Sequence, residues 1–146
     1  MARLTVNEAG TSGYTDEIIL TPGDFAAVSG GTTITVPVKK GDVIEGAALD
    51  ITEAFSTSAN FSVGHDGTII GGSADAEAFI GNKSVSTIAL TPVADSGNSL
   101  DDDGNANANK LRVLADGNID LKAASSLAAD TSGKLKVLLK IRRVNF

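Results

Sequence analysis

Apolar side chains recur at every second position in much of this chain, a period that is typical of β-strands with one face against a core. The longest such segment lies within residues 41–80 and keeps four apolar side chains on one face: Ala47, Leu49, Ile51 and Phe55. The most regular segment lies near residue 140 and points four apolar side chains one way: Leu135, Val137, Leu139 and Ile141. Both segments are therefore predicted to be strands.

Shorter strands are predicted at residues 15–20, 32–38 and 84–92, because each is bounded by glycine, proline or other turn-forming residues. Pro37 has no backbone N–H to donate, so its strand should lie at a sheet edge or end there. Two segments leave the choice open. Arg3–Asn7 has the composition of a short strand or an extended arm, and Asp24–Val28 fits either a strand or one helical turn.

Two turns are predicted to close hairpins. In each case a three-residue loop places the apolar residues before and after the turn, which are all at odd-numbered positions, on one face. A three-residue loop that ends at Gly67, with this glycine in the left-handed region, keeps Val63 and Ile69 on one face. The same argument predicts a three-residue loop at Ala115–Gly117, between two further alternating segments. Asp75–Ile80 is predicted to form a single helical turn.

Together these elements predict an all-β fold: a β-sandwich or jelly-roll-like domain of about 8–10 short antiparallel strands, with at most one or two short helical turns. No segment has the pattern of a βαβ unit. Residues 15–146 are assigned to this single domain, and residues 1–14 to an N-terminal strand or arm. Residues 94–109 are polar and of low complexity, which predicts a long surface loop.

The composition narrows the class of protein. The chain has 146 residues, a length that fits one domain with a buried core. It has five Phe, one Tyr and no Trp, so the core should be aliphatic. The lack of cysteine excludes disulfides and favours synthesis in a reducing cytoplasm. Met1–Gly10 has no leader pattern, and no apolar run reaches the roughly 18–20 residues of a membrane span, so a soluble protein is expected.

Charge is distributed unevenly along the sequence. Residues 134–146 contain five basic residues and no acid, whereas the other 133 residues contain seven basic and 18 acidic residues. An acidic body argues against nucleic acid as a partner, because nucleic-acid binding depends on neutralising phosphates. The basic strip has two interpretations: a contact with an acidic partner surface, or the solvated face of a strand.

Motifs for covalent or phosphate chemistry are missing from the sequence. Neither the nucleophile elbow G-x-S-x-G nor a glycine-rich phosphate loop occurs. The single histidine, His65, would need an orienting partner to act as a base, and Asp66 follows it in a predicted tight turn, where this aspartate is expected to shape the backbone instead. The carboxylate pairs Asp50 with Glu53 and Asp75 with Glu77 are expected by chance among 18 acids. No enzyme activity and no cofactor are predicted.

One acidic segment, Asp101–Asn105, raises the question of calcium. An EF-hand loop has glycine at its sixth position and glutamate at its twelfth. Counted from Asp101, glycine falls at the fourth position and Arg112 at the twelfth, so this pattern fails. A solvated loop is preferred to a loose calcium site, and no metal site is predicted.

Four segments follow one another in an order that is similar to a known group of proteins: Ile51–Phe55, Phe61–Gly64, Asp75–Phe79 and Thr131–Val137. With this order, residues 32–144 resemble small all-β virion proteins of tailed bacteriophages, of the capsid decoration (cement) or head-fibre type. The chain departs from the pattern by an insertion at His65–Gly72, by its basic final strand and by the loop at 94–109.

The resemblance implies a structural protein that is made in the cytoplasm of the bacterial host and resides on the capsid surface of the virion. Its expected partners are the major capsid protein and other copies of itself, as a homo-oligomer and specifically a trimer. Two contact regions are expected, the arm and the basic strip, with these residues: Ala2, Arg3, Leu4, Thr5, Lys134, Lys136, Lys140, Arg142 and Arg143.

Two other functions remain open. The first is a tail, baseplate or head-fibre protein of the same virion, which differs only in its location on the particle. The second is a carbohydrate-binding β-sandwich module. Such modules usually present exposed aromatic side chains, and Tyr14 is the candidate outside the expected core.

Overall fold

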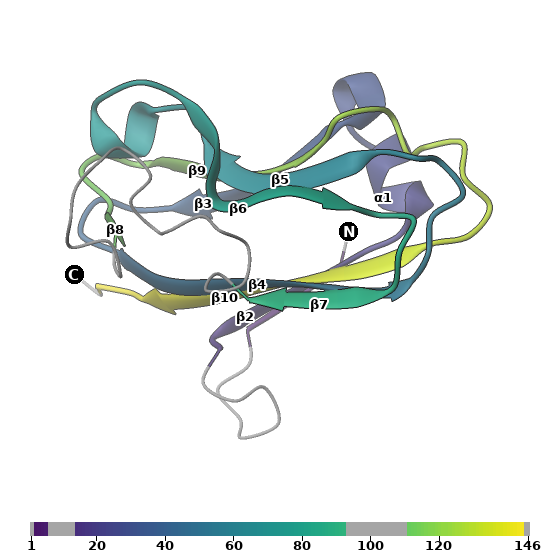
Figure 1. The fold of residues 1–146 in the computed structure, drawn as a ribbon. Helices are drawn as coiled ribbons and strands as arrows, with labels where there is room; N and C mark the ends of the chain where they lie inside the picture. Colours follow the sequence, from purple (N-terminus) through teal and green to yellow (C-terminus); the bar gives the residue numbers. More distant parts are fainter. Residues whose placement is uncertain (1, 6–13, 93–110, 145–146) are drawn as a thin grey trace.

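Two antiparallel β-sheets pack face to face in the computed structural model, which describes residues 2–5, 14–92 and 111–144 (Figure 1). The all-β prediction is confirmed, since the described residues form ten strands and three short helical turns. In chain order the elements are β1 (Ala2–Thr5), β2 (Asp16–Leu20), α1 (Pro22–Ala26), η2 (Ser29–Gly31), β3 (Thr33–Val38), β4 (Val43–Glu53), β5 (Asn60–His65), η3 (Thr68–Ile70), β6 (Asp75–Ser84), β7 (Ala89–Pro92), β8 (Leu111–Arg112), β9 (Gly117–Ala123) and β10 (Lys134–Arg142).

The larger sheet, sheet A, has the order β1-β2-β10-β4-β7, and the short β8 also pairs with β4. Its central strand is β10, which pairs with β2 on one side and along its whole length with β4 on the other. The predicted alternation of both long strands is confirmed. Their inward side chains are at most 3% exposed: Ala47, Leu49, Ile51, Leu135, Val137, Leu139 and Ile141.

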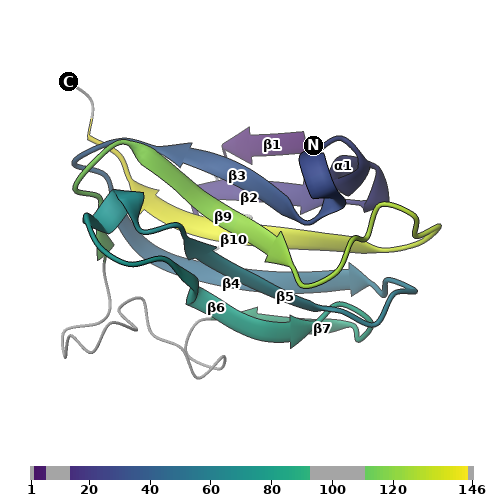
Figure 2. The same ribbon diagram turned by 90° about the horizontal axis from the view of Figure 1, so that it is seen from above.

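The smaller sheet, sheet B, has the order β3-β9-β5-β6. Pro37 lies in β3, opposite Asn118 of β9, and β3 is an edge strand, as its missing N–H predicted. Seen from above, β1 and β3 lie along one side of the sandwich and β6 and β7 along the other (Figure 2). The described strands therefore leave four sheet edges, two on each side.

A short helix covers one end of the sandwich. Thr21 and Pro22 begin α1, and the backbone N–H of Thr21 donates to Oδ2 of Asp24 at 2.9 Å, which holds the first turn. The helix buries Phe25 completely against Phe55 and Phe61, in two edge-to-face contacts with 6.4 Å between ring centroids. Of the two structures considered for Asp24–Val28, the helical turn is observed.

The predicted hairpin at residues 65–67 is wrong. Gly67 does adopt a left-handed φ of 94°, but the chain then forms η3, and β5 pairs with β6, placing Val63 opposite Ile80. Ile69 is fully buried, as its parity required. The odd or even spacing of apolar residues along the sequence indicates which side chains enter the core. It does not distinguish a hairpin from a chain that leaves the sheet and packs above the core.

The second predicted hairpin, at Ala115–Gly117, is also wrong. Before this turn β8 pairs with β4 of sheet A, and after it β9 pairs with β3 and β5 of sheet B. The connection thus crosses from one sheet to the other. Val113, just after β8, and Ile119, on β9, are still both buried in the same core.

Asp75–Ile80 is a strand and not the helical turn that was predicted. It opens β6, whose pairing with β5 shifts register between Phe61 and Val63 and again between Val63 and His65. These bulges bury four successive residues, 78–81, so the alternation that marks a strand is lost. The main chain of β6 also lies directly on Gly64, where an added Cβ would be 2.1 Å from the carbonyl oxygen of Asp75.

At the start of the chain the backbone of Ala2–Thr5 forms β1, which pairs with Asp16–Ile19 of β2. The predicted surface loop at residues 94–109 and the acidic segment Asp101–Asn105 lie outside the described residues.

Candidate functional site

The basic residues of β10 project from the outer face of sheet A, where they alternate with the buried aliphatic residues of the same strand. Four of them lie on this face: Lys134, Lys136, Lys140 and Arg142. Because β10 is held by strands on both sides, these side chains extend from a fixed backbone. The predicted basic strip is therefore a row of cations along the middle of the outer face.

Acidic residues on the neighbouring strands balance much of this charge. Nζ of Lys136 lies 3.5 Å from a carboxylate oxygen of Glu17 on β2, and Nε of Arg142 lies 4.0 Å from Glu45 on β4. Lys134 and Lys140 form no ion pair with the described part of the chain. Ion pairs this exposed contribute about 0–1 kcal/mol each to stability, so their main effect is on the surface potential.

Arg143 is used differently from its neighbours in the strip. Its guanidinium donates two hydrogen bonds, of 2.8 and 2.6 Å, to the fully buried carboxylate of Asp16. These bonds raise the pKa of Arg143 above its ordinary value, although partial burial opposes the shift. Nearby, the carboxylate of Asp42 accepts the backbone N–H groups of Lys39 and Val144 at 3.0 and 3.2 Å. Arg143 therefore ties the end of β10 to the body of the sandwich.

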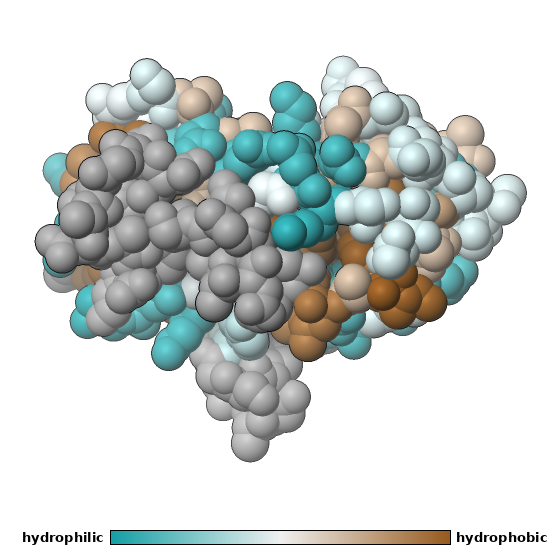
Figure 3. Space-filling model, viewed as in Figure 1, coloured by the Kyte–Doolittle hydropathy of each residue, from teal (hydrophilic) through white to brown (hydrophobic). Residues whose placement is uncertain are grey.

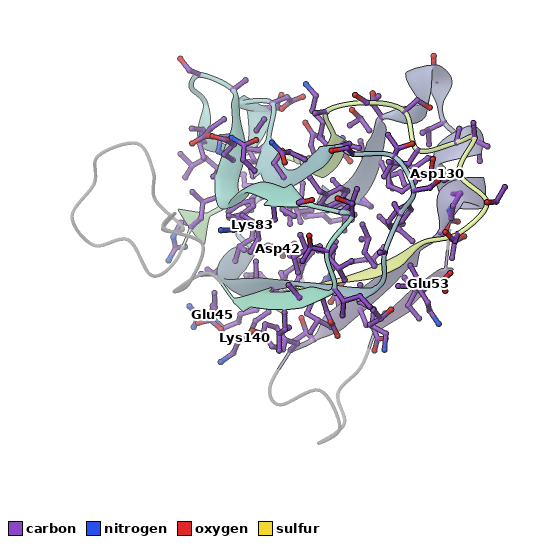
Figure 4. The ribbon with its side chains drawn as sticks, turned by 45° about the vertical axis from the view of Figure 1, so that its right-hand side comes forward. Asp42, Glu45, Glu53, Lys83, Asp130 and Lys140 are labelled. Carbon is purple, nitrogen blue, oxygen red and sulfur yellow. The ribbon has the colours of Figure 1, made fainter. Side chains whose placement is uncertain are left out.

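The remaining charged groups are dispersed over the molecule. Figure 4 shows Glu45 and Lys140 at the outer side of sheet A, and Glu53 and Asp130 at the end where loops join the two sheets. In that loop region Asp130 accepts the backbone N–H of Thr57 at 2.9 Å and its hydroxyl as well. Within the described residues no group of three or more His, Cys, Asp or Glu side chains could hold a metal ion.

His65 is a buried residue of the turn, with 2% of its surface exposed. Its Nδ1 accepts the backbone N–H of Gly67 at 3.1 Å, and its ring contacts Phe79 edge-to-face. Asp66 accepts the N–H of Thr68 at 2.9 Å, and this bond lowers its pKa. The structure thus supports the interpretation of this pair as turn-shaping residues.

One member of each carboxylate pair singled out in the sequence also binds backbone. Asp75 accepts the N–H of Glu77 at 3.0 Å, and Glu53 accepts that of Gly133 at 3.2 Å. Asp75 and Glu77 line an open hollow of about 470 Å³ on the outer face of sheet B, and Ser62 and Lys122 line it as well. This hollow is open to solvent, and its lining mixes polar side chains with the small side chains of Ala74, Ala76 and Ala124, so it has no large apolar wall that would bury a ligand.

Aromatic side chains are in the core. Phe25, Phe55, Phe61 and Phe79 are each at most 2% exposed, so within the described residues only the half-buried Tyr14 could stack on a sugar ring.

One surface feature was missed by the sequence analysis: an apolar patch at the edge of sheet A. Ile88 is 67% exposed and Leu90 is 63% exposed, and Figure 3 shows hydrophobic atoms gathered in the region of β7. A signal was present, because residues 84–92 contain no charged residue. A third exposed hydrophobic residue, Leu114, lies apart from β7, where its N–H donates to the carbonyl of Ile69.

Comparisons with protein-family models, with curated protein sequences and with solved structures found no match to this chain. In residues 2–5, 14–92 and 111–144 there is no helix of the length and apolar character needed to cross a membrane.

Proposed function

We propose that this chain is a structural protein of a bacteriophage virion, which decorates the capsid by binding major capsid protein subunits. It acts through its outer surface, as an oligomer, and the resemblance of residues 32–144 to decoration proteins implies a trimer. The proposed location is the capsid surface, reached after synthesis in the host cytoplasm.

The observation that carries this proposal is the charged outer face of sheet A. Lys134, Lys136, Lys140 and Arg142 project from a strand whose backbone is paired on both sides, and acids flank them on β2 and β4. A fixed pattern of both charges favours a partner with a broad surface of complementary charge over a small substrate. On a shell, symmetry repeats such a contact many times, so a modest affinity per copy is sufficient.

The resemblance supplies the second support, and its segments lie in the framework of the sandwich. The end of β4 lies in Ile51–Phe55, and β5 contains Phe61–Gly64. The first half of β6 is Asp75–Phe79, and β10 begins within Thr131–Val137. The backbone of Ala2–Thr5, in the proposed arm, is the edge of the same sheet A as β10. Both proposed contact regions therefore belong to one sheet.

The test is to mix the purified protein with undecorated capsids and to image the particles. We expect added density with the symmetry of the shell. With undecorated particles that carry tails, density on the tail instead would favour the tail or baseplate alternative. The double variant Lys134→Glu/Lys140→Glu should weaken binding by about tenfold or more, because it reverses two cations that have no acidic partner among the described residues.

The matched control is the double variant Lys83→Glu/Lys122→Glu, which makes the same charge change on β6 and β9, in sheet B. This variant should bind capsids like the unmodified protein. Absence of added density, or equal losses in the strip variant and the control, would count against the proposal.

A further inference from the structure

The strand β7 is a short sheet edge with an exposed apolar surface. It pairs with β4 from Ala89 to Pro92, and within the described residues no strand pairs with its other side. Residues 86–90, which comprise the three residues before β7 and its first two, are all exposed. Ile88 stands immediately before the strand and Leu90 is its second residue, and their side chains are 67% and 63% exposed.

The other three sheet edges carry features that discourage pairing with another chain. On β6 the backbone is bulged twice and carries Asp75, Glu77 and Lys83. On β3 the edge contains Pro37, and on β1 the sequence includes Arg3. Bulges, proline, charge and shortness are the usual protections of a free edge, and β7 has neither a bulge nor a charge, only its length of four residues and its terminal Pro92.

We propose that β7 is a self-association strand, which pairs antiparallel with β7 of a second copy of this chain across a two-fold axis. The pairing would satisfy backbone N–H and C=O groups on the free edges of both copies. It would also bring the Ile88 and Leu90 side chains of the two copies together and remove them from water.

The charge of this edge favours a second copy as the occupant. A two-fold axis brings each part of a surface near its own counterpart, so a charged edge would repel itself. The segment from Ser84 to Pro92 contains no charged residue, and the nearest acid or base before it is Lys83. The edge is therefore compatible with itself.

This inference goes beyond the proposed function and does not depend on it. It predicts that the first assembly is a dimer, in place of the trimer implied by the resemblance. In this dimer sheet A continues from one copy into the other. Capsid binding could fail while the pair forms, and in that case the proposed function falls and the self-association strand stands.

The test compares two exposed leucines by light scattering with size-exclusion chromatography over a series of concentrations. The unmodified chain should show twice the mass of one chain. Leu90→Lys should weaken the dimer by about tenfold or more, because it places two ammonium groups at the axis. Leu114→Lys makes the same change at a leucine that is 53% exposed and away from β7, and it should leave the dimer intact.

A monomeric unmodified chain would overturn the proposal, as would a trimer or a dimer that Leu90→Lys leaves unchanged. Circular dichroism of both variants should match that of the unmodified protein, because neither leucine is in the core.

A second measurement locates the axis. The chain contains no cysteine, so Leu90→Cys introduces a single thiol. Under mild oxidation this variant should form a covalent dimer, and Leu114→Cys should not. Equal cross-linking of the two variants would overturn the two-fold pairing at β7.

Discussion

Arg143 and Asp16 form a two-pronged ion pair, in which Nη1 and Nη2 lie 2.8 and 2.6 Å from the two carboxylate oxygens. The carboxylate has no exposed surface, whereas the Arg143 side chain is 32% exposed. The pair links the residue after β10 to the first residue of β2. It holds the central strand of sheet A to its neighbour beyond the last backbone pairing, which is Leu139 with Asp16.

Replacing this arginine should destabilise the fold. Arg143→Ala leaves a buried carboxylate without its main cation, and we expect the free energy of unfolding to fall by about 3 kcal/mol, at the low end for buried pairs since the arginine is partly exposed. The neighbouring Arg142→Ala removes a 62% exposed side chain at 4.0 Å from Glu45 and should cost about 0–1 kcal/mol. Urea unfolding of the two variants measures the difference, and equal losses would contradict the assignment.

A methyl group at Gly64 should be poorly tolerated. Its Cβ would lie 2.1 Å from the carbonyl oxygen of Asp75 and 2.3 Å from the carbonyl carbon of Ala76, so β6 would have to move away from β5. We expect Gly64→Ala to lower the free energy of unfolding by at least about 2 kcal/mol. In contrast, Gly23→Ala meets nothing within 4 Å in α1 and should raise stability by about 0.4–1 kcal/mol. Thermal and urea unfolding would reveal the opposite signs.

Phe25 should be among the most sensitive core positions, although it lies outside both sheets. It is fully buried and contacts Phe55 and Phe61. Phe25→Ala should reduce the free energy of unfolding by about 3–5 kcal/mol, whereas Phe25→Leu, which leaves a smaller cavity, should cost less. Urea denaturation measures both. If Phe25→Ala cost less than about 1 kcal/mol, α1 would not be the cover of the core.

Asp130 should contribute to acid sensitivity. Desolvation raises its pKa, but hydrogen bonds from Thr57 and Ser56 outweigh this and hold the pKa below its ordinary value of 3.8. The unfolded chain therefore binds this proton at a higher pH than the folded chain. The stabilisation by Asp130 is complete above about pH 5 and is lost as the pH falls through the folded pKa.

The variant Asp130→Asn isolates this effect. The difference in unfolding free energy between the unmodified protein and Asp130→Asn should be constant at neutral pH and should shrink below about pH 4. Urea unfolding at several pH values provides the measurement. A difference that grows on acidification would contradict the assigned sign.

Alternation was a reliable guide where a strand has one face in the core and one in water. In β10 every second residue from Leu135 to Ile141 is buried, and the sequence located this strand correctly. In β6 two bulges bury residues 78–81 in succession, so the period was lost and a strand resembled a helical turn. Gly67 shows a different limit, because its backbone conformation was predicted correctly while the strand that follows pairs elsewhere.

The surface could be predicted only in part. The row of cations on β10 follows from the sequence, but its acidic neighbours Glu17 and Glu45 lie about a hundred residues earlier in the chain, and only the fold brings them together. The role of Arg143 was likewise hidden, since Asp16 is 127 residues away. The edge at β7 could have been noticed from its lack of charge, but that it is an edge depends on strand order.

The central position of β10 has a consequence for how the protein is made. Sheet A needs residues 134–142 between β2 and β4, and these are encoded after all the strands that they join. Until β10 has left the ribosome, β2 and β4 lack the strand that joins them, and the nascent chain cannot close its sandwich. Folding of this domain should therefore begin only after β10 has left the exit tunnel.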